Sequence, residues 1–161
     1  MQDSEDQLKA AELFHLAYTH QMKGELEQAI ELYKQSIALA PTAEAHTFLG
    51  WTYSFQNRYD EAIAECRRAI QVDPNFGNPY NDIGAYLIEQ GQFTEAIPWL
   101  EQATLASRYE SYCFPHYNLG RVYEKLRQWG KAVQSYRKSL EHNAGYGLAK
   151  KALFRLQSQL N

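Results

Sequence analysis

The sequence predicts an all-α protein, an α-solenoid of stacked antiparallel helix pairs with about nine helices. Two observations lead to this fold class. A skeleton of small and apolar residues recurs four times within the 161 residues. Each copy also contains two segments whose apolar residues follow the spacing of an α-helix, separated by a polar turn.

The recurring skeleton is clearest at Leu49-Gly50-x-x-Tyr53, which is followed by Ala62 and Pro74. The position of Ala62 is occupied by alanine in every copy, at steps of 33, 34 and 36 residues (Ala29, Ala62, Ala96 and Ala132). The position of Gly50 is also always small (Ala17, Gly50, Gly84 and Gly120). Two helices approach closely only where side chains are small, so we expect both columns at helix–helix contacts.

Residues that favour turns and helix ends divide each copy into two helices. The turn inside each copy is marked by one residue (Gly24, Asn57, Gly91 and Arg127). We expect Asp60 and Thr94 to cap the second helices of their copies, because their side-chain oxygens can accept hydrogen bonds from backbone N–H groups. Ser4-x-x-Gln7 resembles a capping box for the first helix. Pro41 and Pro74 are expected to end second helices.

The copies predict one repeat array with an additional segment at each end. Residues 1–9 extend the first helix, and the repeats span 10–42, 43–76, 77–112 and 113–146, the third with a longer loop at its end. Residues 147–161 are expected to form a capping helix whose apolar stripe covers the fourth repeat (Leu148, Ala149, Ala152, Leu153, Leu156 and Leu160). With both ends covered, the array is expected to be a complete small solenoid.

These repeated residues resemble the tetratricopeptide repeat family over about residues 10–146. The resemblance implies a right-handed solenoid whose first helices line a concave face that binds other proteins or peptides. The chain departs from the family pattern where an aromatic residue usually opens the first helix, with Leu13, His46, Tyr80 and His116 at that position. Arg108 and Ala144 replace the usual closing proline of the last two repeats.

The side chains left beside the core stripe of each first helix predict a peptide-binding groove, aromatic toward its N-terminal end and basic toward its C-terminal end (Phe14, Tyr18, Trp51, Phe55, Asn81, Ile88, Tyr117, Arg121 and Lys125). Exposed aromatic side chains commonly anchor protein partners. The expected function is therefore a scaffold or adaptor that holds a peptide or helix. One alternative is that neighbouring segments cover these rings. Another is that the same surface forms a homo-oligomer.

Some members of the family hold the acidic tail of heat-shock chaperones with a clamp of Lys, Asn and Arg residues. The matching positions of the first repeats carry Phe14, Tyr18 and Thr47 or Phe48, followed by Asn78 or Asp82. Moving the frame by one repeat gives no better match. A chaperone-tail clamp is therefore not expected.

Other function classes lack their motifs. Cys66 and Cys113 are too few for a disulfide framework or a zinc knuckle, and no nucleophile with a neighbouring base is apparent. His46 and His116 lie two repeats apart, too far to share a metal. The glycines follow the repeat and form no phosphate-binding loop. We therefore expect neither an enzyme nor a metal or other cofactor.

Composition agrees with a folded protein-binding chain. The net charge is −3, which gives no general attraction to nucleic acid, and nucleic acid is not an expected partner. The acidic, polar start is unlike a signal peptide, and no segment has the roughly 18 consecutive apolar residues that membrane insertion needs. The expected location is the cytoplasm.

Overall fold

The computed structural model describes residues 1–161 and is built only of helices, nine in all. The all-α fold class predicted from the repeat is thereby confirmed. The chain forms two compact units, residues 1–79 and 80–161, and each is described by itself. None of the helices is both long and apolar enough to span a membrane.

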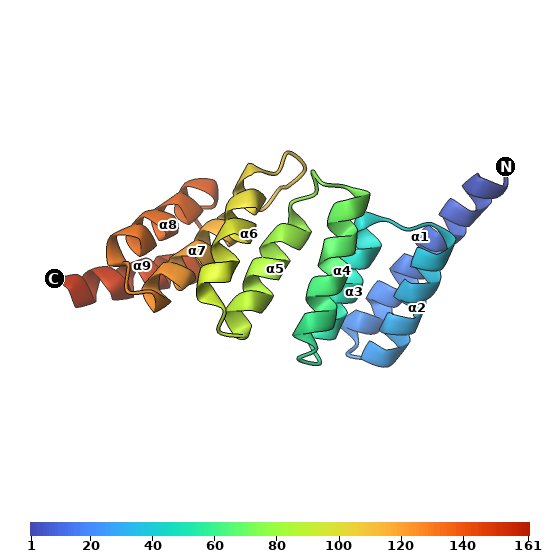
Figure 1. The fold of residues 1–161 in the computed structure, drawn as a ribbon, viewed down its shortest axis with the longest axis horizontal. Coiled ribbons are helices and arrows are strands. Elements are labelled where there is room, and N and C mark those ends of the chain that lie inside the picture. The colour runs from blue at the N-terminus through green and yellow to red at the C-terminus, as the bar shows by residue number, and fades with distance from the viewer. The chain divides into compact units, whose positions relative to one another are not determined.

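Consecutive helices within each unit run antiparallel (Figure 1). Short turns join most of them, and residues 106–112 form the predicted longer loop between the sixth and seventh helices. The first unit contains α1 (Gln2–Met22), α2 (Leu26–Leu39), α3 (Ala43–Ser54) and α4 (Tyr59–Val72). Helix α5 (Asn78–Glu89) begins at the boundary between the units. The second unit continues with α6 (Phe93–Leu105), α7 (Cys113–Lys125), α8 (Trp129–His142) and α9 (Gly147–Leu160).

The four predicted turn markers share one backbone conformation. Gly24, Asn57, Gly91 and Arg127 have φ angles of 78°, 58°, 75° and 58°, in the left-handed region. Each turn is closed by a backbone hydrogen bond that spans it, from Glu25 N–H to the His20 carbonyl in the first repeat and from Gln128 N–H to the Tyr123 carbonyl in the fourth. This is the Schellman ending of a helix, which reverses the chain within a few residues.

The small-residue columns lie at close helix–helix contacts, as predicted. The alanines of both columns are completely buried (Ala17, Ala29, Ala62, Ala96 and Ala132). A Cβ atom added to Gly50 would lie 2.8 Å from the carbonyl oxygen of Ala62, and one added to Gly84 would lie 2.3 Å from a methyl group of Leu100. Both distances are shorter than a van der Waals contact, so a side chain at either position would force the neighbouring atoms to move.

The core of each unit includes one deeply buried column on the second helices (Tyr33, Cys66, Leu100 and Tyr136). Where this residue is tyrosine, the preceding helix supplies an acceptor for its hydroxyl group. The Tyr33 hydroxyl donates to Gln21 Oε1 at 2.7 Å, and the Tyr136 hydroxyl donates to Glu124 Oε1 at 2.8 Å. A polar atom buried in the core is thus paired at equivalent positions of the first and fourth repeats.

The predicted helix caps are wrong in three places. Asp60 and Thr94 lie within the first turns of α4 and α6, which start at Tyr59 and Phe93. Ser4 lies inside α1, and its hydroxyl donates to the Met1 carbonyl at 2.7 Å. In each case the helix begins earlier than the cap pattern suggests. The negative charge of Asp60 still suits the positive end of the α4 dipole.

The apolar stripe predicted for the last helix is only partly buried. Ala149, Ala152 and Leu156 are buried, and the latter two pack in one cluster with Ala132 and Tyr136 of α8. Leu148 and Leu160, by contrast, are each about half exposed, at 53% and 52%. Leu148 is turned about 100° from Ala149 around the helix, and Leu160 is the last residue of α9. The prediction that Leu148 is covered is wrong, whereas Leu160 lies on the side of the stripe, four residues after Leu156, but at the exposed end of the helix.

Candidate functional site

Five aromatic side chains of the first unit form a continuous cluster, here called the aromatic face (Phe14, Tyr18, Phe48, Trp51 and Phe55). Phe48 of α3 is its centre. Its ring centroid lies 5.2 Å from that of Phe14, 5.8 Å from that of Tyr18 and 5.7 Å from that of Trp51, and all three contacts are edge-to-face. Trp51 in turn lies 5.3 Å from Phe55. These are the separations that aromatic pairs prefer.

The aromatic face is partly open to solvent. Tyr18 is 40% exposed and Phe55 is 54% exposed, whereas Phe14, Phe48 and Trp51 are half-buried. Met22, one turn beyond Tyr18 in α1, is exposed as well. Several large apolar side chains are therefore held in fixed positions by one another while their outer edges remain accessible.

Phe48 is not among the site residues predicted from the sequence. The spacing of Phe48, Trp51 and Phe55, by three and then four residues, places all three along one side of α3. That spacing was the signal that could have identified Phe48.

A buried tyrosine of α2 packs against two rings of the aromatic face. The ring of Tyr33 in α2 lies 5.5 Å from that of Phe14 and 6.3 Å from that of Phe48. Burial, with a smaller effect of Tyr18, raises the pKa of Tyr33 well above its ordinary value of 10.0, so its hydroxyl remains a donor to Gln21. This hydrogen bond fixes the ring on which Phe14 and Phe48 rest.

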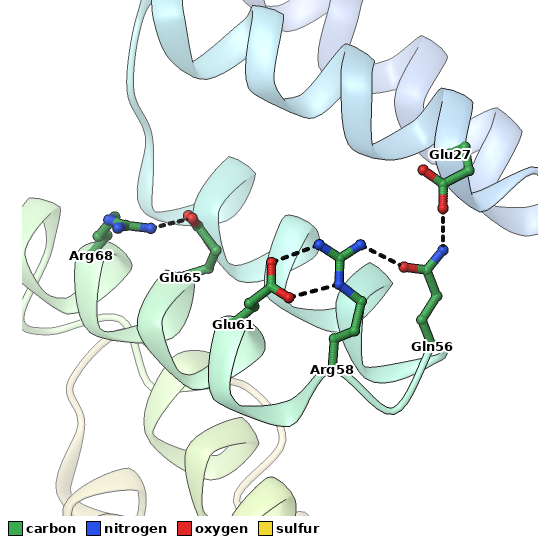
Figure 2. A network of polar contacts seen from close by, with 6 residues as sticks. All are labelled: Glu27, Gln56, Arg58, Glu61, Glu65 and Arg68. Atoms are coloured by element: carbon green, nitrogen blue, oxygen red, sulfur yellow. Dashed lines mark hydrogen bonds and ion pairs between the residues drawn. The ribbon is translucent and has the colours of Figure 1, made fainter.

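A polar network holds the turn that carries Phe55 (Figure 2). The Arg58 guanidinium donates to both carboxylate oxygens of Glu61, at 2.8 and 2.6 Å, and to Gln56 Oε1 at 2.9 Å. Gln56 Nε2 donates to Glu27 of α2 at 2.7 Å. Arg58 also lies over the ring of Tyr53, 4.4 Å from its centroid. The network joins the α3–α4 turn to α2.

The predicted site residues of the second unit have different environments. Asn81 and Ile88 of α5 are buried, at 9% and 7% exposure, so they do not line an open surface as expected. Asn81 Oδ1 accepts a hydrogen bond from Asn118 Nδ2 at 3.0 Å. Their burial results from the packing of α5, whose exposed side cannot be read from apolar spacing alone.

The predicted basic end is partly neutralised. Arg121 donates to Glu89 at 3.3 Å and to Asn118 Oδ1 at 3.1 Å, and its guanidinium lies 6.0 Å from the ring centroid of Tyr117. Tyr117 is half-buried, and Lys125 is exposed. Of the two basic residues, Arg121 is paired with Glu89, and Lys125 is the one whose charge is exposed to solvent.

Three of the five histidines, His46, His116 and His142, pack against side chains of neighbouring helices. His46 Nδ1 lies 2.7 Å from Glu65 Oε2, and Arg68 also pairs with Glu65 (Figure 2 shows the Arg68 pair). His116 stacks on His142, with ring centroids 5.2 Å apart and planes at 8°. No group of three or more His, Cys, Asp or Glu side chains has an arrangement that could hold a metal ion.

The free energy of unfolding should fall as the pH decreases from 6.5 to about 4, because of His116. Burial, with smaller effects of His142 and Lys138, lowers the pKa of His116 from 6.5 to about 4. Its lowered pKa means that the unfolded chain takes up this proton more readily than the folded chain. The stability contributed by the neutral ring is complete above pH 6.5 and is lost toward pH 4.

Urea unfolding of the wild type and His116→Phe between pH 7.5 and 4 measures this effect. The stability of the variant relative to the wild type should increase by about 1–2 kcal/mol on acidification, after allowance for solvent screening of the partly exposed ring. A difference between the two proteins that does not change with pH would contradict the assignment.

Comparison with known proteins identifies the repeat. Three family models described as tetratricopeptide repeat match residues 10–43, 43–76 and 76–144. The Type IV pilus assembly protein PilF of Pseudomonas aeruginosa is 27% identical over 122 residues, covering 75% of this chain and 48% of that protein. The small glutamine-rich tetratricopeptide repeat-containing protein 2 of Mycosarcoma maydis is 31% identical over 70 residues, covering 43% of this chain and 20% of that protein.

Solved structures show the same fold. A structure of Pseudomonas aeruginosa pilF matches 96% of this chain and 70% of its own, with a TM-score of 0.89 and 22% identity. The structure of PilW, a type IV pilus biogenesis factor, covers 93% of this chain and 69% of its own, with a TM-score of 0.84 and 20% identity. The chain spans about half the length of PilF and a fifth of the fungal relative. The repeat models together cover most of the sequence, and the chain belongs to the tetratricopeptide repeat family, whose members are protein–protein interaction scaffolds.

Proposed function

We propose that the chain is a scaffold or adaptor and that the aromatic face of its first unit binds a peptide or helix of a partner protein. The observation that carries this proposal is the contact of five aromatic side chains, two of which are strongly exposed. Exposed apolar clusters of this kind are uncommon on a chain without a partner.

The geometry of the aromatic face favours binding. Aromatic anchors contribute most of the affinity at many interfaces, and they do so best when they are already ordered before the partner arrives. Phe48 and Trp51 are held by edge-to-face contacts with their neighbours, so little conformational freedom is lost on binding. Tyr18 and Phe55 present exposed edges at either side of them.

Two structural relatives support peptide binding as a use of this fold. One is YrrB, described as having an unusual peptide-binding site, with a TM-score of 0.72 and 17% identity. The other is the first repeat domain of Spaghetti (RPAP3) bound to an HSP90 peptide, with a TM-score of 0.68 and 22% identity. We do not propose the same ligand here, because Phe14 and Tyr18 stand where a carboxylate clamp needs polar residues. Likeness to PilF supports a role as an assembly scaffold.

Charge favours a partner with basic residues beside its apolar anchors. The first unit carries 6 Lys and Arg residues against 12 Asp and Glu residues, a balance of −6. Such a field attracts a basic peptide over about 10 Å at low salt and is screened as salt increases. We therefore expect apolar anchors to provide affinity and the basic flanks to accelerate association.

Self-association is the second candidate function. Phe154 of α9 is 75% exposed, and Leu148 and Leu160 add apolar area on the same helix. The two units also have charges of opposite sign, since residues 80–161 carry 10 basic against 7 acidic residues. Light scattering over a range of concentrations distinguishes the two candidates, because only self-association raises the molar mass.

Selection from a random peptide display library tests the proposed function. The wild type should enrich peptides with aromatic or large aliphatic anchors and basic flanks. The double variant Tyr18→Ala/Trp51→Ala should enrich none of them. Trp129→Ala/Phe154→Ala, which removes two exposed rings of the second unit, is the matched control and should select like the wild type. Equal selection by the wild type and the Tyr18/Trp51 variant would disprove the proposal.

A further inference from the structure

A pocket of about 250 Å³ opens next to the aromatic face, where the middle of α1 meets the end of α2 and the start of α3. Phe14 lines it and so belongs both to the pocket and to the aromatic face. Its other walls include the small side chains of Ala10, Ala11 and Ala40, together with Thr42. The surface of the pocket is predominantly apolar.

The second unit contains the equivalent corner, built on the same hydrogen bonds. In the first unit the Ser36 hydroxyl donates to the Ala10 carbonyl at 2.7 Å. In the second unit the Ser139 hydroxyl donates to the Cys113 carbonyl, also at 2.7 Å. The pair α1–α2 therefore corresponds to α7–α8, with Ala10 in the position of Cys113.

This correspondence matches three wall positions with three aromatic residues. Counting from Ala10 and Cys113, Ala11 corresponds to Phe114 and Phe14 corresponds to Tyr117. Thr42 and Tyr146 are both the N-cap residues of the next helix, α3 in one unit and α9 in the other. Ala11 and Phe14 thus correspond to Phe114 and Tyr117 by count, and Thr42 corresponds to Tyr146 as the N-cap residue, one position beyond the count from Ala10 and Cys113.

The three aromatic residues of the second unit pack on one another. The ring centroid of Tyr146 lies 5.3 Å from that of Phe114 and 5.3 Å from that of Tyr117, with the planes at 72° and 84°. Burial raises the pKa of Tyr146, so its hydroxyl stays neutral in this corner. In the first unit Ala11 and Thr42 supply no ring, and the space beside Phe14 is the pocket.

We propose that the pocket of the first unit receives an aromatic side chain, Tyr or Phe, from the partner peptide. The guest ring lies beside Phe14 as Tyr146 lies beside Tyr117. The second unit shows that this corner accepts a ring edge-to-face at 5.3 Å, an arrangement that favours an aromatic over an aliphatic guest. This inference deepens the proposed function and rests on it, since the same peptide crosses the aromatic face.

The polar side chains that line the pocket suit a phenol. Gln7, His15 and Glu44 are among the lining residues, and the His15 ring is 5.7 Å from that of Phe14. An amide and an imidazole can each bond to a hydroxyl group. The pocket therefore combines an apolar wall for the ring with polar side chains in its lining.

NMR with p-cresol, which reproduces a tyrosine side chain, tests the pocket without the partner. Alanine-methyl signals of Ala11 and Ala40 should shift when p-cresol is added to the wild type. Cyclohexanol, of similar size but without a ring current or π-face, should bind about tenfold or more weakly. Equal binding of both probes would overturn the preference for an aromatic guest.

Variants that place the aromatic residues of the second unit at the equivalent positions of the first unit test where p-cresol binds. Ala11→Phe/Thr42→Tyr should keep the fold, because both positions are exposed, although it removes the α3 cap in which Thr42 Oγ1 accepts from Ala45 N–H at 3.1 Å, at a cost of about 1 kcal/mol. It should weaken p-cresol binding about tenfold or more. If this variant fails to fold, Ala11→Leu places a smaller plug at the same wall and should weaken binding in the same direction. Unchanged p-cresol binding in the folded variant would overturn the assignment.

The experiment separates this inference from the proposed function. Tyr18→Ala/Trp51→Ala should still bind p-cresol while losing the selected peptides. If it keeps the peptides, the proposed function fails even where the pocket binds p-cresol. The selected peptides should contain a Tyr or Phe, and Ala11→Phe should abolish the preference for it. If binding needs Trp51 but Ala11→Phe changes no such preference, the pocket assignment fails and the proposed function stands. If the wild type is a dimer and Ala11→Phe/Thr42→Tyr is a monomer, a second copy of the chain occupies the pocket. That result would also overturn the assignment.

Discussion

Gly120→Leu is expected to lower the free energy of unfolding by about 3 kcal/mol, the upper part of the range for overpacked cores. A Cβ atom at position 120 would lie 2.4 Å from the ring of Tyr136. That ring cannot move aside easily, because its hydroxyl donates to Glu124, which also accepts a hydrogen bond from Arg155 of α9 at 2.7 Å. Relief of the clash would therefore disturb three helices of the second unit.

Gly130→Leu is the matched control, since Gly130 also lies in a helix. Nothing lies within 4 Å of a Cβ atom added there, and leucine is the better helix former. The control should be as stable as the wild type or up to about 1 kcal/mol more stable. Urea unfolding followed by circular dichroism compares the three proteins. Equal stability of Gly120→Leu and Gly130→Leu would show that position 120 tolerates a side chain.

Trp51→Ala is expected to weaken binding of a peptide selected on the wild type by about thirtyfold or more, which corresponds to about 2 kcal/mol. Trp51 joins Phe48 to the exposed Phe55, so its removal divides the aromatic face. Isothermal titration calorimetry measures the loss. The loss should persist at high salt, since it arises from apolar contact, whereas the overall association rate should fall as salt increases.

Trp129→Ala provides the control for loss of a tryptophan. Trp129 is 40% exposed and begins α8 in the second unit, whereas every residue of the aromatic face belongs to the first unit. Its removal should leave the affinity within about twofold of the wild type. Thermal melts of both variants establish that they are folded at the temperature of the titration. If Trp129→Ala weakened binding as much as Trp51→Ala, the binding surface would lie elsewhere.

The repeated features were readable from the sequence because they depend on local physics. Helix pairs follow from apolar spacing, and the turn markers Asn57 and Arg127 take the same backbone conformation as the glycines of the other repeats. A position such as Gly50 must be small because a neighbouring backbone passes within contact distance of it. Each of these features involves neighbouring helices, and each recurs, so four copies reinforce one interpretation.

Helix starts and side-chain exposure were less readable. Asp60 resembles a cap, yet α4 begins at Tyr59, because the Schellman turn before it already sets the direction of the chain. Ile88 appeared to face an open surface and is buried, while Leu148 appeared to face the core and is exposed. A side chain's position around one helix is set by its spacing, but what covers that side is set by other helices.

By itself, the sequence determined the number of helix pairs, their turns and the small-residue contacts between them. Only the tertiary structure decided that Phe48 is the centre of the aromatic face, and that Ala11 and Thr42 leave a pocket beside Phe14. These two features depend on side chains from separate helices that meet after folding. Spacing along one helix carries no information on the distance between rings of different helices, so packing alone settles where they meet.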